Sequence, residues 1–230
     1  MIDRSLGEVL RTLRSEHAIR VATVAAAMSL ANAALSSDRS LDRLVSQPDG
    51  LHKAALASGG SYQAGGRSPP KYRMNSLKDL VVNSPTIVVA SVSSATAMLV
   101  DNGRYVRTNH ELNIIETIKG NFAKTDLLEM PGGTYTFSDG AVVNWMEPVW
   151  KSLRTGTTYI LFLHRWEDEP DHFRVVSAGQ GIFEVTSDGQ HLVSHTYIPN
   201  DPLSDEASAG REAFVQKVRS IVVATLDVAE

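Results

Sequence analysis

The chain has 230 residues, 43% of them apolar, which suffices for one or two domains with a packed core. Its formal net charge of −4 disfavours a broad electrostatic footprint for nucleic acid. The sequence has no cysteine, which excludes disulfides, thiol catalysis and cysteine-based zinc sites.

Residues 1–33 have the pattern of an export signal. Arginines precede an alanine-rich apolar run over 21–30, and Ala31-Asn32-Ala33 supplies the small-x-small pattern of a signal-peptidase site. The run is about ten residues long, whereas a membrane-spanning helix needs roughly twenty. We therefore expect a cleaved signal peptide, no stable membrane anchor, and a periplasmic or secreted protein.

Two alternatives remain for this N-terminal segment. Leu6, Val9, Leu10 and Leu13 have the spacing of an amphipathic soluble helix. Residues 6–14 also resemble the first helix of phage-repressor-type helix-turn-helix domains. A recognition helix must present several side chains to base edges, but the stretch 29–40 is mostly small residues. A DNA-binding regulator is therefore the third functional alternative.

Residues 34–75 have the composition of a flexible linker. Ser58-Gly-Gly-Ser61, Gly65-Gly66 and Ser68-Pro-Pro70 interrupt any hydrophobic period. We expect the folded domain to occupy residues 76–230, beginning with a short helix that Ser76 caps.

A long β-hairpin follows. Asn102-Gly103 is a strong signal for a two-residue hairpin loop, because both positions favour positive φ. Such a loop pairs Leu99 with Val106, but the apolar alternation at Val88, Ala90 and Val92 has the opposite parity. One extra residue, a β-bulge at Ser93-Ser94, restores the pattern. Strands this long and bent are typical of a small barrel.

The remaining elements complete a mainly β chain. A strand over 158–163 is apolar on both faces and should be the most buried. An apolar stripe over 206–226 predicts a C-terminal helix that covers the barrel. Further strands are expected at 125–130, 173–176, 181–185 and 191–197. The predicted fold is a small bent β-barrel with a short N-terminal helix and a C-terminal helix.

Four short motifs carry a resemblance. They are Glu116-Thr-Ile-Lys-Gly120, Pro131-Gly132-Gly133, Gly156-Thr-Thr-Tyr-Ile-Leu-Phe-Leu163 and Gln180-Gly-Ile-Phe183. Together they resemble a recurrent strand-rich domain of exported bacterial proteins, similar in outline to oligonucleotide/oligosaccharide-binding (OB) barrels and netrin-like modules. The resemblance implies a fold and an exported setting, but no activity. Netrin-like inhibitors act through an N-terminal cysteine, which this chain lacks.

The sequence has no recognisable motif of an active site, nucleotide site or metal site. His191 and His195 lie on an expected strand, where four residues span about 13 Å, too far for one ion. The acidic run 167–171, flanked by His164 and His172, lacks the spacing of a calcium loop and is interpreted as a solvated loop. We therefore expect no metal and no cofactor.

The preferred function is a non-enzymatic binding module for an unknown protein, peptide or glycan, without nucleic acid. Its candidate surface is the segment 131–153, which has no clear strand period and holds Tyr135, Phe137, Trp145 and Trp150. Pro131, Gly132 and Gly133 are expected to form a structural turn there. The alternative is an extracytoplasmic hydrolase built from scattered residues, for which the candidates are His110, Glu116, Asp139 and His172.

The export prediction is tested by the intact mass of the protein recovered from the extracytoplasmic fraction. We expect a mature chain that lacks roughly the first 33 residues, because the small-x-small site lies there. Recovery of a chain that retains Met1 in the cytoplasm would contradict export and favour the DNA-binding alternative.

Overall fold

The computed structural model describes residues 41, 43–65, 73–124, 126–147, 151–198 and 200–226. The expected signal peptide lies outside these residues, as does Trp150. Over the described ranges, no helix has the length and apolar content needed to cross a membrane.

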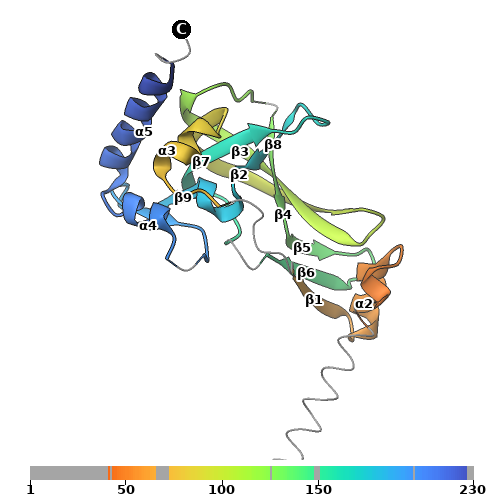
Figure 1. Ribbon diagram of the computed structural model, residues 1–230. Coiled ribbons are helices and arrows are strands. Elements are labelled where there is room, and N and C mark those ends of the chain that lie inside the picture. The colour runs from red at the N-terminus through yellow and green to blue at the C-terminus, as the bar shows by residue number, and fades with distance from the viewer. Residues whose placement is uncertain are drawn as a thin grey trace, which may run out of the picture.

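The expected hairpin is the longest feature of the fold (Figure 1), formed by β2 (Thr86–Val100) and β3 (Tyr105–Lys119). Leu99 lies opposite Val106, and the register shifts between Val92 and Ser94, which confirms the predicted bulge. Two further shifts fall between residues 87 and 88 and between 89 and 90. The loop is longer than predicted, because the turn covers 101–104 and the ladder ends one pair earlier.

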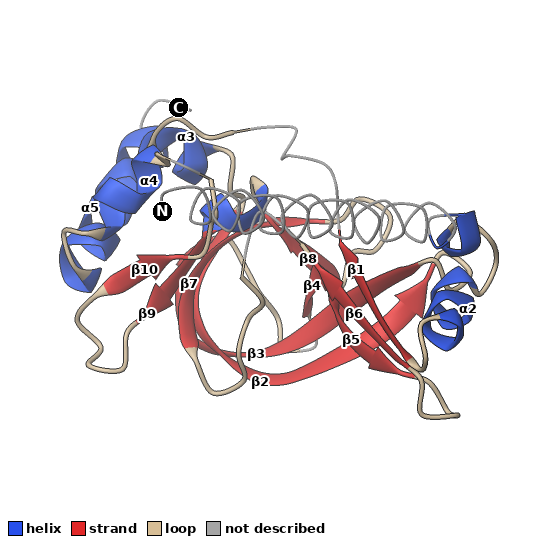
Figure 2. Cartoon of the chain, turned by 90° about the horizontal axis from the view of Figure 1, so that it is seen from below, coloured by secondary structure: helices blue, strands red, loops and turns tan. Residues whose placement is uncertain are grey.

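Five strands close into the predicted barrel (Figure 2). In addition to β2 and β3 they are β4 (Leu127–Pro131), β7 (Thr158–Arg165) and β8 (His172–Val175). The circuit runs β2-β3-β4-β8-β7 and returns to β2, with β4 and β8 parallel. The chain is therefore mainly β, with a closed barrel of the OB-like outline.

Strand β7 is buried on both faces, as its continuous apolar sequence predicts. Tyr159, Leu161 and Leu163 point into the barrel core. Ile160 and Phe162 point the other way, into a second core under the helices. All five are fully buried, so β7 joins the two cores.

Helices cover the outer side of β2 and β7 (Figure 1). They are α3 (Leu77–Val82), α4 (Pro202–Ala207) and α5 (Arg211–Leu226). Ser76 accepts a hydrogen bond from the Asp79 amide, as its predicted capping role requires. The C-terminal helix begins earlier than expected and is divided in two by a turn at 208–210. On this side β9 (Ile182–Val185) and β10 (Leu192–Ser194) extend the sheet from β7, and a 3₁₀ turn, η1 (Ala178–Gly181), precedes β9.

A second sheet corrects two expectations. It consists of β1 (Ser61–Gly65), β6 (Val142–Met146) and β5 (Gly133–Thr136) in that order, with α2 (Gly50–Ala57) packed against it. The segment 131–153 therefore contains two strands, and residues 50–65 of the expected linker belong to the fold. Their apolar residues are too few for a visible period, but they complete a third core with the loop end of the long hairpin.

The glycines that indicated a linker end helix α2. Gly59 has a φ of +78°, its amide donates to the Leu56 carbonyl, and the Gly60 amide donates to the Ala55 carbonyl. These two bonds define a Schellman motif, in which glycine avoids the strain of the left-handed conformation. The same glycines thus turn the chain from α2 into β1.

Instead of the expected turn, Pro131 ends β4 and Gly133 begins β5, with Gly132 between them. Of the two glycines, Gly133 leaves less room for a side chain. Its φ is +128°, and a Cβ there would lie 2.2 Å from Oγ1 of Thr108, which donates to the Gly132 carbonyl. We expect Gly133→Ala to lower the free energy of unfolding by about 2–4 kcal/mol, through backbone strain and disruption of that bond. Chemical denaturation measures the loss.

Gly140→Ala is the matched control, because Gly140 also has positive φ but no atom within 4 Å of the added Cβ. It should cost only about 1–2 kcal/mol. In a Thr108→Ala background Gly133→Ala should cost less, since the blocking hydroxyl is gone. Equal costs for the two glycine substitutions would show that the close approach does not require glycine.

Candidate functional site

The predicted aromatic residues line one face of the small sheet. Tyr135 and Phe137 meet edge to face with ring centroids 5.1 Å apart, and the ring of His52 stacks on Phe137 at 4.2 Å. Trp145 lies edge-on to Tyr105 at 4.8 Å. Tyr135, Phe137 and Trp145 are half-buried and pack on the third core. Their part in ligand binding stays a prediction, and Trp150 lies outside the described residues.

The four candidates for a hydrolase do not converge. Each lies at a different place and has a different partner. His110 contacts the Leu128 carbonyl at the end of the barrel core, Glu116 pairs with Arg219 of α5, Asp139 pairs with His52 near α2, and His172 lies beside Glu169. No acid–base pair is assembled from these four residues, so the geometry gives the hydrolase alternative no support.

A different group gathers on the outer face of β3, β4 and β8. Strand alternation explains it: Leu128 and Phe173 point into the barrel, so their neighbours along each strand point outward. Asn109 lies opposite Glu129 in the β3–β4 ladder, and His164 lies opposite Arg174 in the β7–β8 ladder. We call this group the outer-face cluster. Its members are Tyr105, Arg107, Asn109, Glu129, His164, Trp166, Glu169, His172 and Arg174.

Ion pairs connect the cluster across strands. An Nη of Arg107 lies 2.7 Å from a carboxylate oxygen of Glu129 and 3.6 Å from one of Glu169. Arg174 approaches Glu129 at 3.9 Å, and its guanidinium stacks on the ring of Trp166. The Glu129 side chain is only 10% exposed. A buried carboxylate is costly unless it is paired, so these arginines stabilise its negative charge.

A hollow of about 420 Å³ opens beside these pairs. This volume falls within the range of small-ligand pockets, ~300–1,000 Å³. Aromatic, charged and apolar groups all contribute to its wall. The lining residues are Tyr105, Glu129, Met130, Pro131, His164, Arg174 and Val175.

Several pKa values in this hollow are shifted. Burial, and then the charges of Glu147 and Glu129, raise the pKa of the Tyr105 phenol well above its usual range. Burial and the charge of Arg174 lower the pKa of His164, whose ring is therefore neutral at pH 7. Burial also lowers the pKa of Arg174. Perturbed groups concentrated in a concave site are a mark of function.

The cluster also holds buried polar atoms without a partner. Among the described residues, five buried side-chain N or O atoms have no hydrogen-bond partner, and three of them are here. Two are acceptors, Oδ1 of Asn109 and, with the proton on Nε2, Nδ1 of His172, and the third is the Nε1–H donor of Trp166. Buried polar groups nearly always have a hydrogen-bond partner. The three unpartnered atoms therefore suggest that this face binds a ligand that supplies the missing partners.

A larger hollow, about 830 Å³, lies by Glu184 and Arg154 near β9. Glu184 and Arg154 in its wall already have partners. Nε2 of His195 lies 2.6 Å from one oxygen of Glu184, whose other oxygen pairs with Arg154, and Nδ1 of His195 contacts the Lys151 carbonyl. This pocket therefore offers less to a ligand than the outer-face cluster does.

Comparison with known proteins adds no relative: no protein-family model matches the chain, and no curated protein matches it. The site therefore has to be judged on its own geometry.

Some residues of this site could be recognised from the sequence. Charged and amide residues on the outward positions of the second strand were visible, as was the loop of 167–171 with its flanking histidines. Glu129 was missed, because nothing in the sequence shows that residues about 40 positions apart meet across β4 and β8.

Trp145→Ala tests whether the predicted aromatic surface is part of the core. The indole packs on the third core, and its Nε1 donates to Glu147 at 2.9 Å. We expect a loss of about 2–3 kcal/mol in unfolding free energy, somewhat below that of a fully buried tryptophan. Tyr197→Ala, at a residue that is 55% exposed, serves as the control and should change stability by about 0.5 kcal/mol or less. An unchanged melting curve for Trp145→Ala would favour the binding-loop interpretation.

Proposed function

We propose that this chain is an exported, non-enzymatic binding module that holds a short saccharide on the outer-face cluster. The observation that carries the proposal is the hollow beside Tyr105 and Arg174, together with the unpartnered Nε1–H of Trp166, whose ring lies against the Arg174 guanidinium. The exported setting rests on the sequence of residues 1–33 and on the resemblance of the four short motifs.

Fold-level analogy supports this choice of face. In OB-type barrels the face of the second and third strands and the loop between the fourth and fifth strands bind oligonucleotides and oligosaccharides. Here those elements are β3, β4 and the loop 166–171, which carry the outer-face cluster. The analogy concerns the position of the site and not the identity of its ligand.

Charge favours a saccharide over a nucleic acid. Phosphate backbones are bound by unpaired lysines and arginines, but Arg107 and Arg174 both lie against Glu129. The loop beside them adds Glu167, Asp168 and Asp171. A polyanion would meet these carboxylates, whereas a neutral sugar would not be repelled.

Hydroxyl groups also suit the hydrogen-bonding groups at this face. A sugar hydroxyl can accept from Nε1–H of Trp166 or from Arg174 and donate to Glu129 in the same complex. Aromatic rings beside such groups, here Tyr105 and Trp166, add apolar contact area with little conformational freedom to lose.

The test is a binding screen of the full chain against neutral and acidic oligosaccharides, short peptides and single-stranded nucleic acids. We expect saccharide binding that weakens about tenfold or more in Trp166→Phe and Arg174→Ala, because each loses a hydrogen bond to the ligand. Arg154→Ala is the control, since this arginine pairs with Glu184 outside the cluster and its loss should leave binding unchanged.

Saccharide binding that survives both substitutions would place the ligand elsewhere on the chain. Binding of a peptide or a nucleic acid in preference to sugars, with the same sensitivity to Arg174→Ala, would keep the site and overturn the ligand class.

A further inference from the structure

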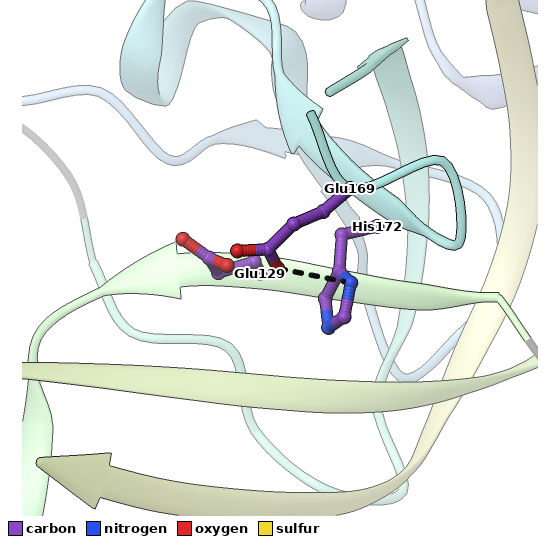
Figure 3. A group of neighbouring side chains, drawn as sticks. All are labelled: Glu129, Glu169 and His172. Carbon is purple, nitrogen blue, oxygen red and sulfur yellow. Dashed lines mark ion pairs between the residues drawn. The ribbon is translucent and has the colours of Figure 1, made fainter. Parts of the chain in front are cut away.

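Three side chains of the outer-face cluster converge on one point (Figure 3). Glu129 comes from β4, His172 from β8 and Glu169 from the loop before β8. One ligand-type atom from each of the three lies within 4.8 Å of the other two. Figure 3 shows the carboxylate of Glu169 between Glu129 and the ring of His172. A cluster of acidic groups is not by itself a metal site. The case for metal binding therefore depends on the other polar atoms around these carboxylates.

Asn109 supplies an independent observation. It is only 8% exposed, its Oδ1 has no hydrogen-bond partner among the described residues, and it lies directly opposite Glu129 in the β3–β4 ladder. Residues paired in this way point to the same face, with Cβ atoms roughly 5 Å apart. A buried amide oxygen on this face needs a positive partner or a donor.

His172 presents a second acceptor to the same point. Its Nδ1 lies 3.2 Å from Oε2 of Glu169, yet the two atoms are not aligned for a hydrogen bond and Nδ1 is otherwise without a partner. Two atoms that both bind a zinc ion at about 2.1 Å lie ~3.4 Å apart in a tetrahedral arrangement. The observed separation is close to that value.

We propose that Glu129, Glu169, His172 and Asn109 form a binding site for a divalent transition-metal ion, of which Zn²⁺ fits best. The donor set combines an imidazole nitrogen with carboxylate and amide oxygens. Calcium and magnesium take oxygen ligands, whereas imidazole suits zinc and its first-row neighbours. Binding requires a neutral imidazole and ionised carboxylates, so the affinity falls as the pH is lowered.

Arg107 is the competitor of the metal ion at this site. Its guanidinium lies 2.7 Å from Glu129 and 3.6 Å from Glu169 and so neutralises the same carboxylates. The ion enters by displacing Arg107 from them and drawing in Glu169, whose side chain is 43% exposed on its loop. Removing the arginine therefore strengthens metal binding, whereas a merely structural ion-pair network predicts no such gain.

This inference does not rest on the proposed function, although the two share Glu129. The ion also needs Glu169 and His172, whereas the saccharide proposal depends on the donors Trp166 and Arg174. The two are also tested with different ligands. Zinc binding without saccharide binding would leave the metal site standing, and the reverse result would leave the saccharide site standing.

The experiment measures Zn²⁺ affinity of the full chain by competition with a chromophoric chelator at about pH 7. We expect one ion per chain, with at least a tenfold loss of affinity in Glu169→Gln and in His172→Phe. Asn109→Leu should weaken binding by a smaller factor, and Arg107→Met should strengthen it severalfold. With Co²⁺ as a substitute, the visible absorption of a bound imidazole complex should appear in the wild type and be lost in His172→Phe.

His191→Phe is the matched control, because His191 also lies beside a carboxylate, with its Nδ1 2.9 Å from Asp188, but at an exposed turn. It should leave the affinity unchanged. Glu169→Gln lies on the loop and keeps the barrel intact, so it decides the outcome if a strand variant fails to fold. Wild-type binding below one ion per chain, or equal affinity in the wild type and Glu169→Gln, would overturn the proposal.

Discussion

The three register shifts in the β2–β3 ladder are the constraint on which the rest of the structure depends. Each adds an unpaired residue, and all three fall within residues 87–94 of β2, so the ribbon bends strongly there. One end of the ribbon can then close a barrel with β4, β8 and β7, while the other end carries Val106 and Leu99 into the third core. Without these bends the two ends could not serve separate cores.

Much of this fold was predictable from local patterns. Apolar parity in the two arms of the hairpin required the bulge after Val92, and the unbroken apolar run of β7 required burial on both faces. One of the motifs that carried the resemblance also has a structural role. Gln180 is fully buried, accepts from the Met74 amide and donates to Asp201, so its side chain ties three distant segments together.

What the sequence did not predict depends on pairing between distant segments. Strand β1 has no apolar alternation, and its parallel pairing with β6 uses backbone groups that any residue could supply. The outer-face cluster has the same origin. Glu129 stands out only when β4 is placed between β3 and β8, because its partners Arg107 and Arg174 come from those two strands. The candidate site was therefore recognisable in its loop and its histidines, but not in the carboxylate that joins them.

The parallel pairing of β1 has a consequence for the surface of the molecule. In the small sheet β6 lies between β5 and β1, so β1 covers backbone N–H and C=O groups of β6 that would otherwise face solvent. An uncovered strand edge is a template for pairing with a second chain. Residues 61–65 thus replace β6 as the edge of the small sheet, and with five residues they leave a second chain only a short edge to pair with. Part of the segment expected to be a flexible linker therefore determines how much strand edge this side of the molecule exposes.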